Sequence, residues 1–359
     1  MIDKKSGIHL SHLTIKNYKK LNSLEINFPR PLMKGDADIL VFGSKNGGGK
    51  TSILECCALL MLAGIVGEKF RIFRENDIAN LLVKAGQEQA SIEGKFEQDD
   101  KECSIFIIIN YQTGFSKPII KGEKSLFNRL DKKPYFDELD DSLNSIFAFS
   151  GEPLVIPPLL HFNSYRKVQE SNPELGMMAD DYPKHRIMRI STRSGMRTSN
   201  PVSSFKLEIL RSLMGRASLF EGINEQESQL VLSKLNHLIQ RYCGGQIEHL
   251  RPLPDNKVDI RIKPSTGGES FSFDGLSSGQ KEMIATLFLI WRNTQEQPCI
   301  VLIDEPELHL NAEWHGDFVR QLYKLAPENQ YILATHSEEI FRSVDKKHRA
   351  ILVADDNGV

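Results

Sequence analysis

A glycine-rich segment between two apolar runs constrains the fold of this chain more than any other feature. Gly43-Ser-Lys-Asn-Gly-Gly-Gly-Lys-Thr51 has four glycines in its first seven positions, which disfavours both a helix and a strand interior. The run 38–42 before it predicts a buried strand, and the stretch 52–63 after it predicts a helix, with Gly64 as its expected end. A strand, a tight loop and a helix in this order aim backbone N–H groups and the positive helix end at one point, which predicts a phosphate site.

The residues of this P-loop have expected roles in binding ATP and Mg²⁺. Lys50 would reach the β- and γ-phosphates, and the Thr51 hydroxyl would hold Mg²⁺. The common spacing places a glycine where this chain has Ser44, with Gly43 one position earlier, so we expect a turn one residue longer. A glycine-rich surface loop is the alternative interpretation. The expected ATP-binding residues are Ser44, Lys45, Asn46, Gly47, Gly48, Gly49, Lys50, Thr51 and Ser52.

Two further apolar runs predict buried strands that end in polar residues. The run 298–303 is typical of a parallel strand covered on both faces, and Asp304 and Glu305 follow it. We expect Asp304 to bind Mg²⁺ and Glu305 to polarise and orient the attacking water of phosphoryl transfer. The run 331–335 ends at His336. The alternative interpretations are a plain acidic turn for Asp304-Glu305 and a hydrogen-bonded surface residue for His336.

A fourth segment, 273–291, begins with small residues and continues as a long apolar helix. Ser277, Ser278 and Gly279 would present small side chains and free N–H groups at the start of that helix, a second anion site. An N-capped core helix is the alternative. Together with Gln280, the segment resembles the signature loop of ABC-type ATPases, which completes a nucleotide site on the partner subunit. The resemblance implies a head-to-tail homodimer at least, with these four residues acting in trans.

The order of the four segments, with Leu13-Thr-Ile-Lys-Asn-Tyr18 and Asp304-Glu-Pro-Glu-Leu-His-Leu310, resembles the RecF-, SMC- and OLD-type branch of the ABC ATPases. The pattern is most similar to the OLD-like ATPases (overcoming lysogenization defect) and the Septu-type ATPases of bacterial antiphage systems. Asn311-Ala312 stands where those families commonly have His-Pro. In this register His336 resembles the switch histidine that contacts the γ-phosphate, so the expected catalytic residues are Lys50, Glu305 and His336.

The resemblance implies an α/β P-loop NTPase of ABC-ATPase type. Its mixed or parallel core would carry an N-terminal antiparallel β portion and a helical insertion before the signature. We expect one ATPase domain over 1–359, with a P-loop lobe at 1–165, a helical and basic insertion at 166–245, and the signature, Asp304-Glu305 and His336 in 246–359. Alternation and apolar periodicity predict strands within 8–28, 90–96, 103–109, 159–163, 246–251, 258–262 and 350–353, and helices at 204–217 and 225–242.

The resemblance also implies an ATP-gated dimer that senses nucleic acid and controls a nuclease or other effector. The chain ends just past its last predicted strand, so we expect no C-terminal Toprim nuclease and a separate effector, such as an HNH nuclease. Only about 225 residues separate the P-loop from the signature, without a heptad tract, which disfavours a long coiled-coil machine. A RecF-like DNA repair and loading ATPase is the alternative, and a membrane transporter subunit is disfavoured.

Composition indicates a protein of the cytoplasm. The 359 residues are 40% hydrophobic, no apolar run is long enough to span a membrane, and the amino terminus lacks a secretion signal. The five cysteines lack paired spacing, so we expect them reduced. A net charge of −2 disfavours generic attraction to nucleic acid.

One local segment carries positive charge without any acid. It has five cations in fourteen residues, and as a helix it would place four arginines on one face. We expect a contact with DNA, RNA or an acidic partner there, and a solvated linker is the alternative. The residues are Lys184, Arg186, Arg189, Arg193 and Arg197.

Two roles near the nucleotide stay open on the sequence. One role belongs to the polar residue that completes the γ-phosphate lobe, which usually follows a strand. Asn163 and Arg166 are candidates because they follow a strand, whereas Gln87 and Gln89 precede one. Tyr18-Lys19 would flank the nucleotide or form a surface turn.

Overall fold

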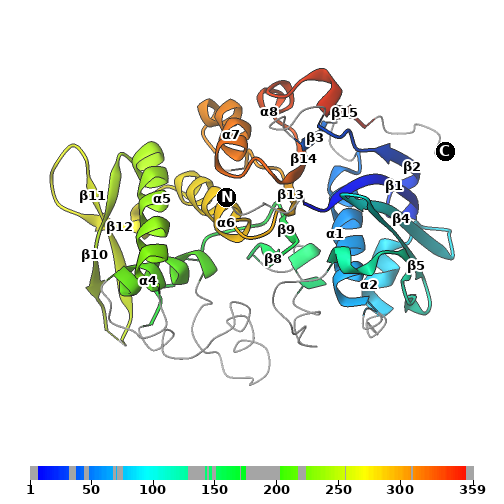
Figure 1. Ribbon diagram of the computed structural model, residues 1–359, viewed down its shortest axis with the longest axis horizontal. Helices are drawn as coiled ribbons and strands as arrows, with labels where there is room; N and C mark the ends of the chain where they lie inside the picture. The colour runs from blue at the N-terminus through cyan, green and yellow to red at the C-terminus, as the bar shows by residue number, and fades with distance from the viewer. Residues whose placement is uncertain are drawn as a thin grey trace. The chain divides into compact units, whose positions relative to one another are not determined.

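The computed structural model divides into two compact units, one formed by Met1–Tyr165 with Asn293–Val359 and the other by Arg166–Arg292 (Figure 1). The structure describes residues 7–31, 38–43, 48–67, 70, 76–127, 142–143, 145–147, 151–169, 171–174, 203–216, 224–254, 256–308 and 310–352.

A mostly parallel sheet forms the centre of the first unit, with the strand order β15-β3-β14-β13-β9-β8. Its middle strands are buried over nearly their whole length, which explains their continuous apolar sequence. Because β3, β13 and β14 are parallel neighbours, their carboxyl ends meet at one edge, where Gly43, Asp304 and Thr335 end their strands. The strands are β3 (Asp38–Gly43), β8 (Leu154–Ile156), β9 (Leu159–Phe162), β13 (Ile300–Asp304), β14 (Gln330–Thr335) and β15 (Arg349–Ile351), with β8 antiparallel to β9.

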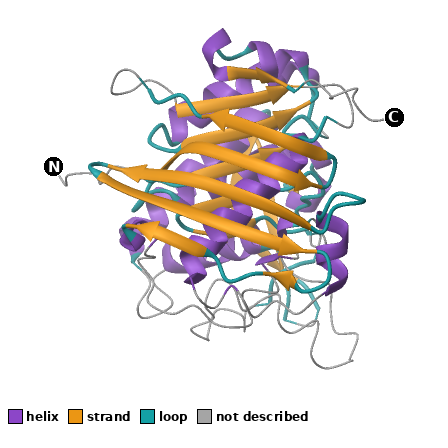
Figure 2. Cartoon of the chain, turned by 90° about the vertical axis from the view of Figure 1, so that its right-hand side faces the viewer, coloured by secondary structure: helices purple, strands orange, loops and turns teal. Residues whose placement is uncertain are grey.

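An antiparallel sheet forms the second layer of this unit, and its long strands run side by side in Figure 2. The strands are β1 (His9–Tyr18), β2 (Leu21–Asn27), β4 (Gln89–Gln98), β5 (Lys101–Asn110), β6 (Gly114–Phe115) and β7 (Ile119–Gly122). The strands predicted within 8–28, 90–96 and 103–109 are confirmed, and they pair as the β1–β2 and β4–β5 hairpins. Each turns through a residue with positive φ, Lys19 at 50° and Asp99 at 52°.

Helix α1 (Lys50–Val66) packs between the two sheets, against β9, β13 and β14 on one side and β1, β4 and β5 on the other. Residues 52–63 are therefore all buried, and the helix is apolar around its circumference. The prediction that it ends at Gly64 is wrong, because the helix continues to Val66 and Gly67 follows at φ 60°. At Gly64 an ideal Cβ would lie 2.5 Å from the Phe127 ring, so glycine permits a close contact there.

Several shorter helices also belong to the described part of the first unit. They are α2 (Asn76–Leu82), α7 (Ala312–Leu325), α8 (Glu338–Arg342) and the short 3₁₀ segments Lys124–Phe127 and Lys346–His348. None of the described helices is long and apolar enough to cross a membrane.

The second unit contains the signature segment. Helices α4 (Ser204–Arg216) and α5 (Glu225–Cys243) pack together, as predicted. Asn224 caps the start of α5, and Gly244 follows its end at φ 66°. A three-stranded antiparallel sheet consists of β10 (Gly245–Pro252), β11 (Val258–Pro264) and β12 (Phe271–Ser272). A 3₁₀ turn (Phe273–Gly275) leads to α6 (Ser278–Asn293), which is almost wholly buried.

Candidate functional site

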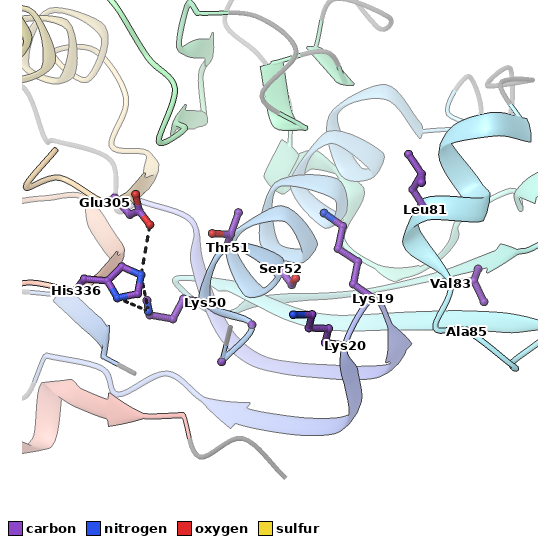
Figure 3. A pocket seen from close by; sticks show the side chains of 12 residues that line it. Lys19, Lys20, Lys50, Thr51, Ser52, Leu81, Val83, Ala85, Glu305 and His336 are labelled. Carbon is purple, nitrogen blue, oxygen red and sulfur yellow. Dashed lines mark hydrogen bonds and ion pairs between the residues drawn. The ribbon is translucent and has the colours of Figure 1, made fainter. Parts of the chain in front are cut away.

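A cavity of about 660 Å³ in the first unit is lined by seven of the predicted site residues (Figure 3). This volume is typical of a site for a small molecule. Its walls come from the β1–β2 turn, the start of α1, the end of α2 with the segment after it, and the residues that follow β13 and β14. The lining residues are Lys19, Lys20, Gly48, Gly49, Lys50, Thr51, Ser52, Leu81, Val83, Ala85, Glu305 and His336.

The start of α1 forms one wall of this cavity. Gly49 has φ 85°, and an ideal Cβ there would lie 2.6 Å from Leu21, so both backbone and space require glycine. The Ile53 N–H donates to the Gly49 carbonyl at 3.1 Å and begins the helix, whose positive end then faces the cavity. Ser44, Lys45, Asn46 and Gly47 of the predicted P-loop lie outside the described residues.

Three predicted residues meet in one cluster at the cavity. The Lys50 ammonium lies 3.1 Å from Nε2 and 3.3 Å from Nδ1 of His336, and His336 Nε2 lies 3.4 Å from Glu305 Oε1 (Figure 3). Burial lowers the pKa of the Lys50 ammonium, and the carboxylates of Glu305, Asp304 and Glu307 act against that shift. The cluster therefore joins a cation, an imidazole and a carboxylate, the groups that phosphoryl transfer needs for charge and water positioning.

Thr51 and Asp304 form the expected magnesium position. The Thr51 hydroxyl donates to Asp304 Oδ2 at 2.9 Å, and Asp304 is 1% exposed. Both donor atoms are oxygens, which suits Mg²⁺. In the described part of the chain, no group of three or more His, Cys, Asp and Glu side chains could hold a metal. The pair thus fits an ion whose remaining ligands are substrate phosphates and water.

The backbone of Glu305 is held in an unusual conformation. Its φ is 46°, in the left-handed region that non-glycine residues rarely adopt, at a cost on the order of 1 kcal/mol. Its N–H donates to the Ala334 carbonyl at 2.8 Å. The conformation turns the chain sharply at the end of β13, and Figure 3 shows the Glu305 carboxylate directed toward His336.

A second carboxylate of the same segment was missed by the sequence analysis. Glu307 accepts hydrogen bonds from the Thr335 hydroxyl at 2.7 Å and from the His336 N–H at 2.5 Å. The signal was available in the Glu-Pro-Glu run, because a second acid beside a catalytic one needs a partner of its own.

The β1–β2 turn lines the cavity, with a buried cluster behind it. Lys19 donates to Glu55 Oε1 at 2.6 Å, and the Tyr18 hydroxyl donates to Glu55 Oε2 at 3.1 Å. Burial raises the pKa of Glu55, and Lys19 opposes the rise. The location of Lys19 at the cavity supports the interpretation that Tyr18-Lys19 flanks the nucleotide, rather than forming only a surface turn.

An apolar wall completes the cavity, and sequence patterns did not indicate it. Leu81, Val83 and Ala85 belong to the end of α2 and the segment after it. The Lys19 N–H donates to the Leu82 carbonyl at 2.7 Å, which ties this segment to the β1–β2 turn. No motif marks these residues, because their role depends only on that tertiary contact.

The signature residues lie in the second unit, at the start of α6. Ser277 N–H donates to Gln280 Oε1 at 3.0 Å, and Gln280 N–H donates to Ser277 Oγ at 3.3 Å, a reciprocal capping box. The Gln280 amide also donates to the Tyr242 carbonyl at 3.0 Å. The expectation of a free Ser277 N–H is therefore wrong, because the capping box uses it. Ser278 is exposed and Gly279 is buried.

Other residues considered for the site lie elsewhere. Asn163 is 3% exposed, donates to the Ser145 carbonyl and accepts from the Tyr165 N–H, so its side chain organises the end of β9. Among the described residues, the lining of the cavity does not include Asn163, Arg166, Gln87 or Gln89. The basic residues Lys184, Arg186, Arg189, Arg193 and Arg197 lie outside the described residues.

Residues 9–357 match the profile of the RecF/RecN/SMC N terminal domain. The chain belongs to this family. Its fold is accordingly that of an ABC-type P-loop ATPase, as predicted. An Smc head bound to the C-winged helix domain of ScpA shares the fold, with a TM-score of 0.54 over 94% of this chain and 93% of that chain, at 15% identity.

Two curated proteins match this chain over shorter stretches than the family profile does. A retron Vc95 probable ATPase of Vibrio cholerae is 34% identical over 95 residues, which are 24% of this chain and 18% of that protein. The DNA replication and repair protein RecF of Leptospira interrogans is 32% identical over 129 residues, 36% of this chain and 29% of that protein. The matched part thus spans less than a third of either relative.

Proposed function

We propose that this RecF/SMC-family ATPase domain binds ATP with Mg²⁺ in the described cavity and hydrolyses it to ADP and phosphate. The cluster of Lys50, His336 and Glu305 carries the proposal, because three separate elements bring these groups within hydrogen-bonding or ion-pair distance. The glycine-rich start of α1 suits the triphosphate, and the apolar wall at Leu81 and Val83 suits the base.

The proposed reaction needs little covalent chemistry from the protein. Glu305 accepts a hydrogen bond from a water and takes up its proton as the water oxygen attacks the γ-phosphorus. The bond to the β–γ bridging oxygen breaks, and ADP leaves. Lys50 and His336 offset the charge on the γ-phosphoryl oxygens. Thr51 and Asp304 would hold Mg²⁺, which neutralises charge on the β- and γ-phosphates when bound.

Three variants test the hydrolysis itself. Lys50→Ala removes the phosphate-binding cation, and we expect weak ATP binding and no turnover above background. Glu305→Gln keeps the size of the side chain but orients water poorly, so we expect near-normal ATP binding with kcat lower by about 100-fold or more. Lys16→Ala alters an exposed lysine of β1 and serves as the control. Wild-type turnover in Glu305→Gln would contradict the assigned role.

We further propose that ATP is held between two copies of the chain in a cytoplasmic homodimer, with Ser277, Ser278, Gly279 and Gln280 acting in trans. The exposed Ser278 supports this, because a small side chain at a helix start lets a phosphate approach. The five cysteines are free, which suits a reducing compartment.

The dimer is proposed to gate a separate effector, such as a nuclease, in antiphage defence. The match to a retron probable ATPase supports this role, and the match to RecF favours a DNA repair ATPase as the second candidate. Binding of the purified protein to bare DNA separates them. A Kd that weakens steeply with salt indicates phosphate contacts and favours repair, whereas ATP-dependent activation of a co-purified nuclease favours defence.

A further inference from the structure

The segment after Glu305 contacts the end of β14 at three successive residues. The Glu305 N–H donates to the Ala334 carbonyl, and the Glu307 carboxylate accepts from the Thr335 hydroxyl and the His336 N–H. Both oxygens of Glu307 are thus used, Oε2 at 2.7 Å and Oε1 at 2.5 Å. The backbone of His336 is held by this segment independently of its ring.

The position of Glu307 relative to Glu305 is fixed by the backbone between them. The Leu308 N–H donates to the Glu305 carbonyl at 3.1 Å, and the Leu310 N–H donates to the Glu307 carbonyl at 3.0 Å. These consecutive turns follow the left-handed Glu305. The backbone therefore fixes the point from which the Glu307 side chain reaches the end of β14.

The ring of His336 has weaker contacts than its backbone. It meets Glu305 Oε1 at 3.4 Å and Lys50 at 3.1 Å, and the side chain is 34% exposed. These contacts are longer than the 2.7 and 2.5 Å hydrogen bonds that the Glu307 carboxylate accepts, and short charge-assisted hydrogen bonds are the stronger ones. The Glu307 clamp, defined here as Glu307 with its bonds to Thr335 and His336, is the firmest link between the water-orienting carboxylate and the imidazole.

We propose that Glu307 is a positioning residue for hydrolysis, which holds His336 at a fixed distance from Glu305 before nucleotide arrives. The inference rests on the proposed ATPase function and adds to it a residue that is not among those lining the cavity. Preorganised geometry lowers the barrier of phosphoryl transfer, whereas binding of the triphosphate depends mainly on the start of α1. Loss of the clamp should consequently lower kcat and leave KM for ATP nearly unchanged.

Two substitutions at Glu307 remove the clamp fully or in part, and kcat should fall accordingly. Glu307→Ala removes both hydrogen bonds, and we expect kcat to fall about 100-fold. Glu307→Gln keeps the shape and one acceptor oxygen but directs an amide toward the other donor, so about a 10-fold fall is expected. Glu313→Ala removes an exposed carboxylate in the first turn of α7 and should retain wild-type kcat, as the matched control.

A double-mutant cycle separates positioning from a general structural effect. Thr335→Val removes the hydroxyl that donates to Glu307 and also accepts from the Ser337 N–H. If the two side chains act through one clamp, Glu307→Ala with Thr335→Val should lower kcat no more than about 3-fold beyond Glu307→Ala alone. Thr335→Ser keeps the hydroxyl and should restore most of the kcat that Thr335→Val loses.

Steady-state ATPase kinetics, ATP binding by calorimetry and thermal melting on the full chain test the proposal. Lower kcat with KM, Kd for ATP and Tm near wild type supports it. Wild-type kcat in Glu307→Ala, or a change confined to KM, overturns it. If Glu307→Ala does not fold, Glu307→Gln and the Thr335 variants decide by the same criteria. No turnover by the wild type would instead refute the proposed hydrolysis.

Discussion

Glu55 places a carboxylate inside a helix that is otherwise apolar and buried on all sides. Its side chain is 5% exposed, and its two oxygens accept from Lys19 and Tyr18. A charged residue in a buried apolar run requires a partner, so the sequence contained the signal. It did not identify the partner, because the β1–β2 turn precedes Glu55 by 36 residues and no periodicity links them.

Lys19→Met tests this pair. Removal of the ammonium leaves a buried carboxylate without its cation, and we expect the free energy of unfolding to fall by about 2 kcal/mol at pH 8, less than for a fully buried pair because Lys19 is partly exposed. Urea unfolding followed by circular dichroism measures the loss. Lys19→Arg, which retains the cation, is the control.

The pH dependence of that loss has a definite sign. Burial raises the pKa of Glu55 in the folded protein above its pKa in the unfolded chain. The folded protein therefore binds the proton more tightly, and its stability falls as the pH rises from the unfolded pKa to the folded pKa. Lys19→Met removes the group that opposes the rise. The variant should therefore lose more stability at pH 8 than at pH 5, and Glu55→Gln in the same background should abolish the difference. An equal loss at both pH values would contradict the explanation.

Among the helices and strands, periodicity predicted most elements. Helices α2, α7 and α8 were not predicted, and the end of α1 was misplaced because of a glycine. The β1–β2 and β4–β5 hairpins and helices α4 and α5 agree with their predicted ranges, because each alternates or repeats over at least seven residues. Gly64 was interpreted as a helix stop. Its actual role is contact with the Phe127 ring, which a single sequence cannot distinguish from a stop.

Two glycines inside helices make a matched pair of tests. Gly64→Ala adds a methyl group 2.5 Å from a buried aromatic ring, so despite the better helix propensity of alanine we expect a loss of about 1–2 kcal/mol. Gly316→Ala lies on the exposed side of α7 with nothing within 4 Å, and we expect a gain of about 0.5–1 kcal/mol. Denaturant unfolding of both variants measures the contrast. A gain in Gly64→Ala would show that Phe127 moves freely.

For the molecule as a whole, the sequence located the proposed catalytic groups because each follows a strand in the parallel sheet. Adjacent parallel strands bring Lys50, Glu305 and His336 to one edge, so motif order alone predicted their proximity. The Glu307 clamp and the apolar wall were not predictable in this way. Both depend on side-chain and loop contacts within the folded unit, for which the sequence carries no periodic signal.

The proposed dimer is the central claim, and light scattering of Glu305→Gln with and without ATP and Mg²⁺ tests it most directly. This variant should bind ATP without hydrolysing it, and we predict that its mass doubles when ATP is added. Lys50→Ala, which cannot hold the phosphates, and Ser278→Arg, which places a bulky cation at the exposed signature position, should keep the mass of the nucleotide-free protein. An unchanged mass for Glu305→Gln, with ATP binding intact by calorimetry, would contradict the ATP-sandwiched dimer.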